Sequence, residues 1–254
     1  MNHEDIVLQI KNKLAEIEQT ENVRVILAAE SGSRAWGFAS PDSDYDVRFI
    51  YVRKPEDYIR LNPVRDVIEW QLDEIYDISG WDLQKMLRLA RNSNPSVHEW
   101  CASPIIYMEN ELAAPMRELV TGCFLPKKSL YHYLNMARRN YNTFLTKDEV
   151  RIKRYFYALR PVLAARWVAH NQTAPPMLFD ELVKAELKPE LVPTVEELLR
   201  IKKEMPEVGT GPIIPELNEY ILEQMEILEE EADKAENRKN DWDRLEAFFR
   251  NAVL

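Results

Sequence analysis

The feature that most constrains the fold of this chain is the stretch from residue 30 to residue 52, in which a short polar loop leads from one strand-like run, which ends just before it, into a second one. The run before the loop, residues 23–27, is rich in β-branched side chains and predicts a strand. The run after it, residues 46–52, predicts a second strand, and the acids Asp44 and Asp46 stand at its start. Because side chains alternate along a strand, these two acids point to the same side. An apolar core gains nothing from such a pair, so a partner outside the core must stabilise it.

The length and composition allow one large domain or two modest ones with a substantial core, since the chain has 254 residues of which 46% are hydrophobic. The two cysteines, Cys101 and Cys123, lack the paired spacing of a disulfide framework and favour a reducing compartment. The sequence has neither the basic-then-apolar order of a leader nor a run of about 18 apolar residues. We therefore expect a cytoplasmic protein with no membrane partner.

The charge of the chain limits its partners. A formal net charge of −10 repels polyanions at long range, so contact with nucleic acid requires a local basic patch. The four histidines are scattered, without an HExxH motif or a Cys/His cluster, and this argues against a zinc site.

The remaining sequence divides into a part with strands and a part that is almost wholly helical. A helix is predicted at residues 3–19, and residues 64–70 and 74–78 read as an antiparallel pair of strands. Further helical patterns cover residues 130–144, 150–170, 179–186, 194–204 and 215–237. The expected fold class is α+β: a small mixed β-sheet with helices on one face in residues 1–125, followed by an all-helical domain in residues 126–254.

The acidic pair indicates metal. Strand geometry places Asp44 and Asp46 about 5 to 7 Å apart, where they repel unless cations lie between them. Oxygen ligands on a rigid element suit Mg²⁺ or Mn²⁺, and two such ions stabilise the attacking and leaving oxygens in phosphoryl transfer. Gly32 lets backbone amides approach a triphosphate closely, and the hydroxyl and amide of Ser33 can hold its terminal phosphates.

The pattern of Gly-Ser, ten residues, and Asp-x-Asp flanked by apolar residues resembles the signature of the polymerase-beta-like nucleotidyltransferase superfamily. The matching segments are Gly32-Ser33-Arg34-Ala35 and Ser43-Asp44-Tyr45-Asp46. More narrowly, the chain looks like the RNA-ligase-associated (RlaP-type) nucleotidyltransferase family over about residues 25–170. The segments that carry this likeness are residues 30–52 and 76–82, Asn94-Pro95, Glu99-Trp100 and Ser103-Pro104.

The resemblance implies a palm-like nucleotidyltransferase domain with a third carboxylate at the end of the strand predicted at residues 74–78. Asp77 is the candidate, and Asp73, Glu74 and Asp82 are the alternatives. The third acid would help to bind the catalytic metal and would activate the attacking hydroxyl.

The predicted helix at residues 150–170 carries a second set of candidates. Lys153, Tyr157 and Arg160 share one face beside an apolar stripe, and the resemblance implies that a lysine and an aromatic residue of the helical domain contact the triphosphate. Pro161 is expected to kink this helix or to begin another. The residues expected to bind the nucleotide are Gly32, Ser33, Arg34, Lys153, Tyr157 and Arg160.

The expected function is the transfer of a nucleotidyl group from a nucleoside triphosphate such as ATP to a hydroxyl acceptor, with two Mg²⁺ or Mn²⁺ ions and release of pyrophosphate. Two kinds of acceptor stay open. The resemblance implies an RNA end in a repair setting, and the acidity of the chain favours a small molecule or a protein hydroxyl. A non-catalytic nucleotide-binding regulatory module is the further alternative, and a complete acidic triad would argue against it.

Overall fold

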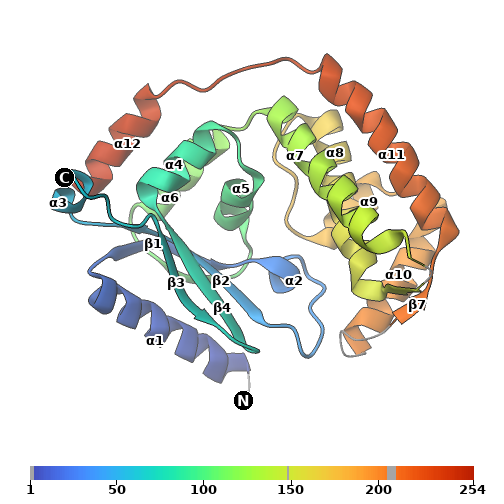
Figure 1. The fold of residues 1–254 in the computed structure, drawn as a ribbon, viewed down its shortest axis with the longest axis horizontal. Coiled ribbons are helices and arrows are strands. Elements are labelled where there is room, and N and C mark those ends of the chain that lie inside the picture. Colours follow the sequence, from blue (N-terminus) through green and yellow to red (C-terminus); the bar gives the residue numbers. More distant parts are fainter. Residues whose placement is uncertain (1–2, 148, 205–209) are drawn as a thin grey trace. The chain divides into compact units, whose positions relative to one another are not determined.

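The chain forms two compact units in the computed structural model, drawn in Figure 1. The structure describes residues 3–147, 149–204 and 210–254. We call one unit the palm unit, which comprises Met1–Ala35, Asp44–Cys123 and Lys239–Leu254. The other is the helical unit, which comprises Trp36–Ser43 and Phe124–Arg238.

Two segments group differently from the predicted division between residues 125 and 126, and apolar packing explains both. Residues 36–43 belong to the helical unit because Phe38 packs there, with its ring centroid 5.2 Å from that of Phe156. Residues 239–254 belong to the palm unit because Leu245, at 2% exposure, lies in a palm core cluster.

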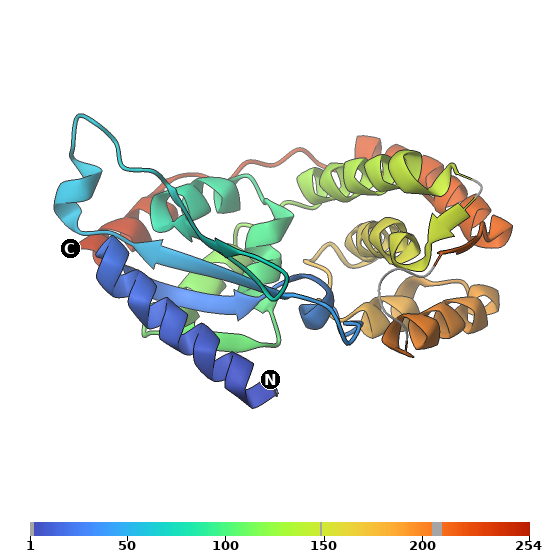
Figure 2. The ribbon, with the colours of Figure 1, turned by 60° about the horizontal axis from the view of Figure 1, so that its bottom comes forward.

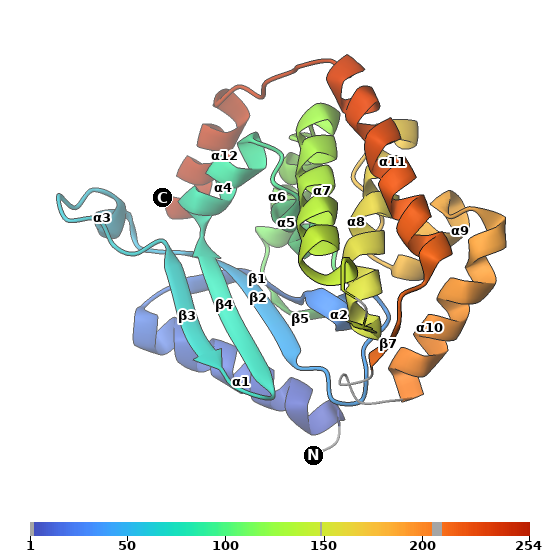
Figure 3. The ribbon, with the colours of Figure 1, turned by 45° about the vertical axis from the view of Figure 1, so that its right-hand side comes forward.

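The palm unit is built on a five-stranded mixed sheet with the strand order β3-β4-β2-β1-β5 (Figure 3). The strands are β1 (Arg24–Glu30), β2 (Tyr45–Val52), β3 (Val67–Leu72), β4 (Tyr76–Asp82) and β5 (Ile106–Glu109). Strands β2 and β4 pair in parallel, and the other pairs are antiparallel. The predicted antiparallel pair, now β3 and β4, is therefore confirmed, with its boundaries shifted by a few residues.

Helices cover both faces of this sheet. The helices of the palm unit are α1 (His3–Glu21), α2 (Gly32–Ala35), α3 (Pro55–Tyr58), α4 (Leu83–Arg91), α5 (Pro95–Ala102), α6 (Ala113–Thr121) and α12 (Asp243–Val253). Figure 2 shows α1 along one face and α4 on the other. The fully buried Ile10, Leu14 and Ile17 of α1 pack on one side of the sheet, and α4, α5, α6 and α12 pack on the other.

The α+β class is confirmed, and the expected one-sided cover of the sheet is corrected to a two-sided cover. The reason lies in β1, in which every residue after Arg24 is buried. A strand that is apolar on both faces needs a layer on each side.

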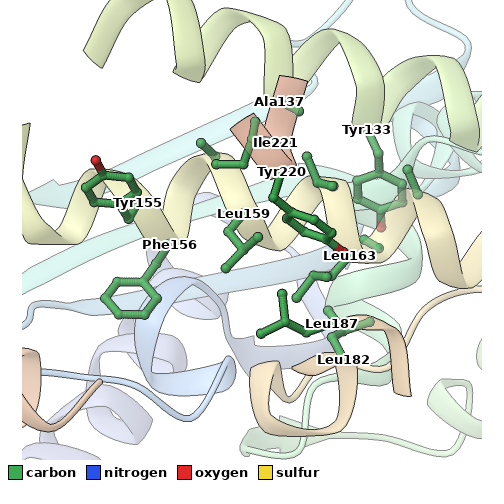
Figure 4. Packing of buried hydrophobic residues seen from close by; sticks show 14 of the residues in the cluster. Tyr133, Ala137, Tyr155, Phe156, Leu159, Leu163, Leu182, Leu187, Tyr220 and Ile221 are labelled. Carbon is green, nitrogen blue, oxygen red and sulfur yellow. The ribbon is translucent and has the colours of Figure 1, made fainter. Parts of the chain in front are cut away.

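The helical unit packs its helices around one apolar cluster, part of which Figure 4 shows. Its helical elements are α7 (Pro126–Asn140), the π-helical turn η1 (Tyr141–Leu145), α8 (Ile152–Asn171), α9 (Phe179–Glu186), the 3₁₀ turn η2 (Pro189–Leu191), α10 (Val192–Glu204) and α11 (Pro215–Lys234). A short two-stranded sheet, β6 (Glu149–Arg151) with β7 (Thr210–Pro212), was not expected. Leu159 and Leu163 of α8 point into this core beside Tyr220 and Ile221 of α11.

Helix α8 continues through Pro161, so the expectation that this proline begins a new helix is wrong. Proline has no N–H with which to bond the carbonyl four residues earlier, that of Tyr157. The side-chain amide of Asn140 in α7 donates to that carbonyl at 2.8 Å. This external donor satisfies the group that the proline leaves open. None of the described helices is long and apolar enough to cross a membrane.

Candidate active site

The acidic pair stands at the start of β2, as the alternation of the sequence predicted. Asp44 directly precedes the strand and Asp46 is its second residue. Tyr45 and Val47, which alternate with them, are buried at 5% and 0% exposure, while both acids keep partial contact with solvent. The strand thus presents its acids on the face opposite to its apolar side chains.

Asp77 lies opposite Asp46, because the two residues are register partners in the parallel pair β2 and β4. The alternatives have other surroundings. Asp73 accepts hydrogen bonds from the backbone N–H groups of Ile75 and Tyr76 in the turn before β4, both at 2.8 Å. Asp82 ends β4 and caps α4 through the N–H of Gln84 at 2.7 Å.

Glu74, the last alternative, is an exposed residue of that same turn. Of the four acids considered, the sheet register therefore places Asp77 beside the Asp44/Asp46 pair.

The Gly32–Ser33 turn packs directly against Asp46. Gly32 has a φ of +59°, and a Cβ added there would collide with Oδ2 of Asp46. A side chain at this position is therefore excluded by both backbone conformation and space. Ser33 is the second residue of the short helix α2 and is itself 6% exposed.

Arg34, predicted to contact the nucleotide, holds the acidic strand in this structure. Its Nε donates to the backbone carbonyl of Asp44 at 2.9 Å, and its guanidinium lies 3.8 Å from the centroid of the Tyr45 ring. These contacts fix the backbone from which both acids project.

Glu30 is a component of the site that sequence reasoning missed. Its side chain is fully buried at the end of β1, where Oε1 accepts the backbone N–H of Asp46 at 2.8 Å and Oε2 accepts the hydroxyl of Tyr107. Burial raises the pKa of Glu30 to about 7, against the lowering effect of these two hydrogen bonds. The available signal was an acid that ends an otherwise apolar strand.

Arg48 is the second missed component. It follows Asp46 by two residues, so it shares the face of the acids, and this alternation was the signal that could have identified it. Its Nη2 donates to Oδ2 of Asp77 at 2.6 Å and to Oδ1 of Asp46 at 3.2 Å. The guanidinium thus lies between the two carboxylates.

The electrostatics of the site favour an added cation. Burial and the neighbouring charge of Asp44 together raise the pKa of Asp46 to about 6, whereas Arg48 and Arg34 act in the opposite direction. Asp44, Asp46, Asp77 and Glu30 outnumber Arg34 and Arg48, so acids are in excess at these strand ends.

The donor set fits Mg²⁺ or Mn²⁺, which prefer carboxylate oxygens and phosphates over nitrogen and sulfur ligands. Among the described residues, however, no three Asp, Glu, His or Cys side chains are gathered closely enough to hold a metal ion without further ligands. Between Asp46 and Asp77, Arg48 takes the intervening space. A metal ion held between Asp46 and Asp77 therefore requires that Arg48 move.

The remaining nucleotide candidates lie on α8 in the helical unit. Arg160 is 3% exposed, with its guanidinium 4.4 Å from the centroid of the Trp36 ring, and Tyr157 meets the same ring edge-on at 6.2 Å. Lys153 is half-buried near the start of the helix. These residues belong to a different unit from the acids, so their contact with the same nucleotide stays a prediction.

Comparison with known proteins identifies relatives over nearly the whole chain. A family model described as the RNA repair pathway DNA polymerase beta family (RlaP) matches residues 6–251. The chain is also similar to the uncharacterized protein YcgL of Bacillus subtilis (strain 168), at 45% identity over 235 residues, which cover 92% of this chain and 90% of the relative.

Among solved structures, the chain matches a nucleotidyltransferase-like protein from Exiguobacterium sibiricum 255-15. The match covers 90% of this chain and 74% of that protein, at 13% identity and a TM-score of 0.32. A likeness this distant adds nothing to the family assignment.

Proposed function

Because the chain belongs to the RNA repair pathway DNA polymerase beta family, we propose that it is a metal-dependent nucleotidyltransferase acting on a nucleoside triphosphate. The observation that carries this proposal is the register of β2 and β4, which sets Asp77 opposite Asp46 while the Gly32 turn packs against the same carboxylate. A family signature and a converging set of acids thus point to one place in the palm unit.

In this proposal Asp44, Asp46 and Asp77 are the carboxylates that hold two Mg²⁺ or Mn²⁺ ions. The ions would supply positive charge for the phosphates and for the attacking and leaving oxygens. The backbone at Gly32 and Ser33 would approach the triphosphate, since no side chain at Gly32 separates them. Arg34, through its bond to the Asp44 carbonyl, keeps the acidic strand in position.

Asp77 would take the proton of the acceptor hydroxyl. The oxygen of that hydroxyl then forms a bond to the α-phosphorus, the bond from this phosphorus to the bridging oxygen breaks, and pyrophosphate leaves. Glu30 supports the step by fixing the backbone N–H of Asp46 at 2.8 Å.

We propose an RNA end as the acceptor, because the matching family is described as part of an RNA repair pathway. Within the helical unit, a pocket of about 320 Å³ is lined by Lys147, Arg151 and Arg154 together with Phe144, Glu149 and Thr210, and Arg154 lies 3.7 Å from the Phe144 ring centroid. Cations beside an aromatic ring suit phosphates and bases of a single strand. Three cations against one acid make this the kind of local basic patch that a chain with a net charge of −10 needs for contact with RNA.

The proposal also includes a reducing compartment such as the cytoplasm. Both cysteines, Cys101 and Cys123, are free and buried, and burial raises the pKa of the Cys123 thiol. Unreactive core thiols need no oxidising environment.

The test uses purified full-length protein with Mg²⁺ or Mn²⁺ and each of four α-labelled triphosphates, with and without total RNA. We expect label to enter the RNA fraction and pyrophosphate to be released in equal amount. Label that enters protein instead would move the acceptor to a protein hydroxyl. If the protein binds the triphosphate but transfers no label, the result would favour the regulatory module.

A further inference from the structure

Arg48 is the member of the acidic site for which the proposed reaction gives no use. Its guanidinium makes four hydrogen bonds at the junction of β2 and β4. Nη2 bonds Oδ2 of Asp77 at 2.6 Å and Oδ1 of Asp46 at 3.2 Å. Nη1 bonds the backbone carbonyls of Asp77 at 2.6 Å and Val47 at 3.2 Å. The cationic group therefore fills the space that the two carboxylates share.

The two oxygens of Asp46 consequently have different neighbours. Oδ1 faces Arg48 and, beyond it, Asp77. Oδ2 faces Gly32, at the turn where the triphosphate is expected. The side near Oδ2 and Gly32 would take one cation, and the second position, between Asp46 and Asp77, already holds a guanidinium.

A divalent ion and a guanidinium cannot share the second position. Two positive groups a few ångströms apart repel strongly in a partly buried site. An arginine does not relieve this repulsion by losing its proton, because its pKa is too high. It can relieve it only by moving.

The surroundings permit this movement. The side chains of Arg48, Asp46 and Asp77 are 17%, 22% and 28% exposed, so the cluster borders on solvent. The guanidinium is carried on a long side chain with several rotatable bonds, which can swing outward while the backbone of β2 stays in the sheet.

We propose that Arg48 holds the place of one of the two divalent ions in the metal-free protein, so that the position between Asp46 and Asp77 accepts metal only after the guanidinium leaves. This inference rests on the proposed function and adds to it a role for Arg48. When the guanidinium swings outward, Oδ2 and the backbone carbonyl of Asp77 lose their hydrogen bonds to it, and Oδ2 of Asp77 and Oδ1 of Asp46 would then be available to hold the ion.

The position of Arg48 has a chemical advantage. While Nη2 of Arg48 lies 2.6 Å from Oδ2 of Asp77, the guanidinium covers that oxygen and keeps other hydroxyl groups away from it. Water that enters the site before the acceptor and the second ion would then meet a covered carboxylate oxygen. Arg48 thereby limits hydrolysis of the bound triphosphate.

The test measures Mn²⁺ binding to the full-length protein from the EPR signal of free Mn²⁺, without nucleotide and with a non-hydrolysable triphosphate. We expect Arg48→Met to raise the affinity for Mn²⁺ in the absence of nucleotide by roughly tenfold or more, because a competing positive charge is gone. The melting temperature of the metal-free variant should fall and its rise on adding Mn²⁺ should exceed that of the wild type.

Arg48→Gln is the second variant. It keeps a polar N–H donor at position 48, and it is used in case Arg48→Met does not fold. Arg24→Met is the matched control: Arg24 is at the other end of the same sheet, pairs with Glu111 at 3.0 Å, and should leave Mn²⁺ binding unchanged. Equal or weaker Mn²⁺ binding in both folded Arg48 variants would overturn the inference.

The same titration separates this inference from the proposed function. If the wild type binds Mn²⁺ with the triphosphate and loses it in Asp44→Asn, the proposed function stands, and the Arg48 variants alone decide the inference. If neither the wild type nor any Arg48 variant binds Mn²⁺ with the triphosphate, both proposals fail together.

Discussion

The buried acids of the two units differ in the partners that surround them. In the palm unit, Glu30 and Asp46 lie at the ends of adjacent strands among further acids, and burial raises the pKa of both. In the helical unit, Glu186 is 5% exposed but lies 2.8 Å from Nδ1 of His170 and 3.5 Å from Nε of Arg166. The helical unit matches its buried acid with nitrogen partners, whereas the palm unit leaves an excess of acid. The unmatched charge indicates a binding site, and the matched charge indicates structure.

The largest expected effect is the loss of nucleotidyl transfer in Asp44→Asn and Asp46→Asn. Each removes a metal ligand, which should cost at least as much as a general base, whose contribution is about 10²- to 10⁴-fold. Transfer of labelled nucleotide measures this. Variants that keep more than about a tenth of wild-type activity would contradict the assignment of these acids as metal ligands.

The melting temperature, in contrast to the activity, should not fall in the Asp46→Asn variant. In the wild type, the pKa of Asp46 is about 6 in the folded state and about 3.9 in an unfolded chain, so between these pH values the folded state binds the extra proton. The resulting stability is present at low pH and is lost as pH rises through 6. At pH 8 without metal, Asp46→Asn should therefore melt at or above the wild-type temperature.

The second effect in size is that of Asp77→Asn. We expect turnover to fall by about 10²- to 10⁴-fold while triphosphate affinity changes little, since Asp44 and Asp46 remain. Kinetics and equilibrium binding on one protein preparation measure the two quantities. Asp82→Asn, which alters the cap of α4 and the hydrogen bond from the Tyr58 hydroxyl, serves as the control. A loss of turnover in Asp82→Asn with normal Asp77→Asn would move the third acid to residue 82.

The third effect concerns stability in the helical unit. Glu186→Gln should lower the free energy of unfolding by about 2 kcal/mol, because the buried carboxylate of Glu186 loses its contacts with Nδ1 of His170 and Nε of Arg166. Urea denaturation followed by circular dichroism measures it. The comparison between the units requires that Glu186→Gln lower the free energy of unfolding and that Asp46→Asn at pH 8 leave it unchanged or raise it. A stabilising effect of both substitutions would contradict the comparison.

The smallest effect is a pH dependence that comes from His98, a residue of the palm unit outside the acidic site. Burial lowers the pKa of His98 to about 4, and its unfolded value is about 6.5. The unfolded state binds more protons in this window, so the contribution of neutral His98 is present above pH 6.5 and is lost as pH falls toward 4. The melting temperature of His98→Gln should change less between pH 4.5 and 7 than that of the wild type. An equal change of melting temperature with pH in both proteins would show that His98 is not the titrating group.

Local sequence patterns were sufficient for several elements, among them α1, the β3–β4 pair and α8. Alternation along residues 44–47 predicted that Tyr45 and Val47 are buried and that the two acids are not. The choice of Asp77 followed from the family resemblance, and the register of β4 agrees with it.

What the sequence could not supply were the contacts between distant segments. Three such contacts are the packing of α1 on the second face of the sheet, the packing of α12 on the palm unit and the hydrogen bond from Arg48 to Asp77. Each of them depends on which elements are neighbours in space. Local periodicity contains no information about these neighbours. Arg48 shared the face of the acids in the sequence, but only the parallel pairing of β2 with β4 gives it a partner.

The return of α12 has a consequence for biosynthesis. Residues 239–254 are synthesised well after α4 and α6, yet Leu245 and Phe249 contribute to the same apolar cluster as those two helices. The palm unit therefore has an incomplete core until residues 239–254 have been made, whereas residues 124–238 can begin to fold earlier. We expect nascent chains that stop short of residue 239 to expose the α4 and α6 surface and to depend on chaperones, and the acidic site to mature only after residues 239–254 have packed on the palm unit.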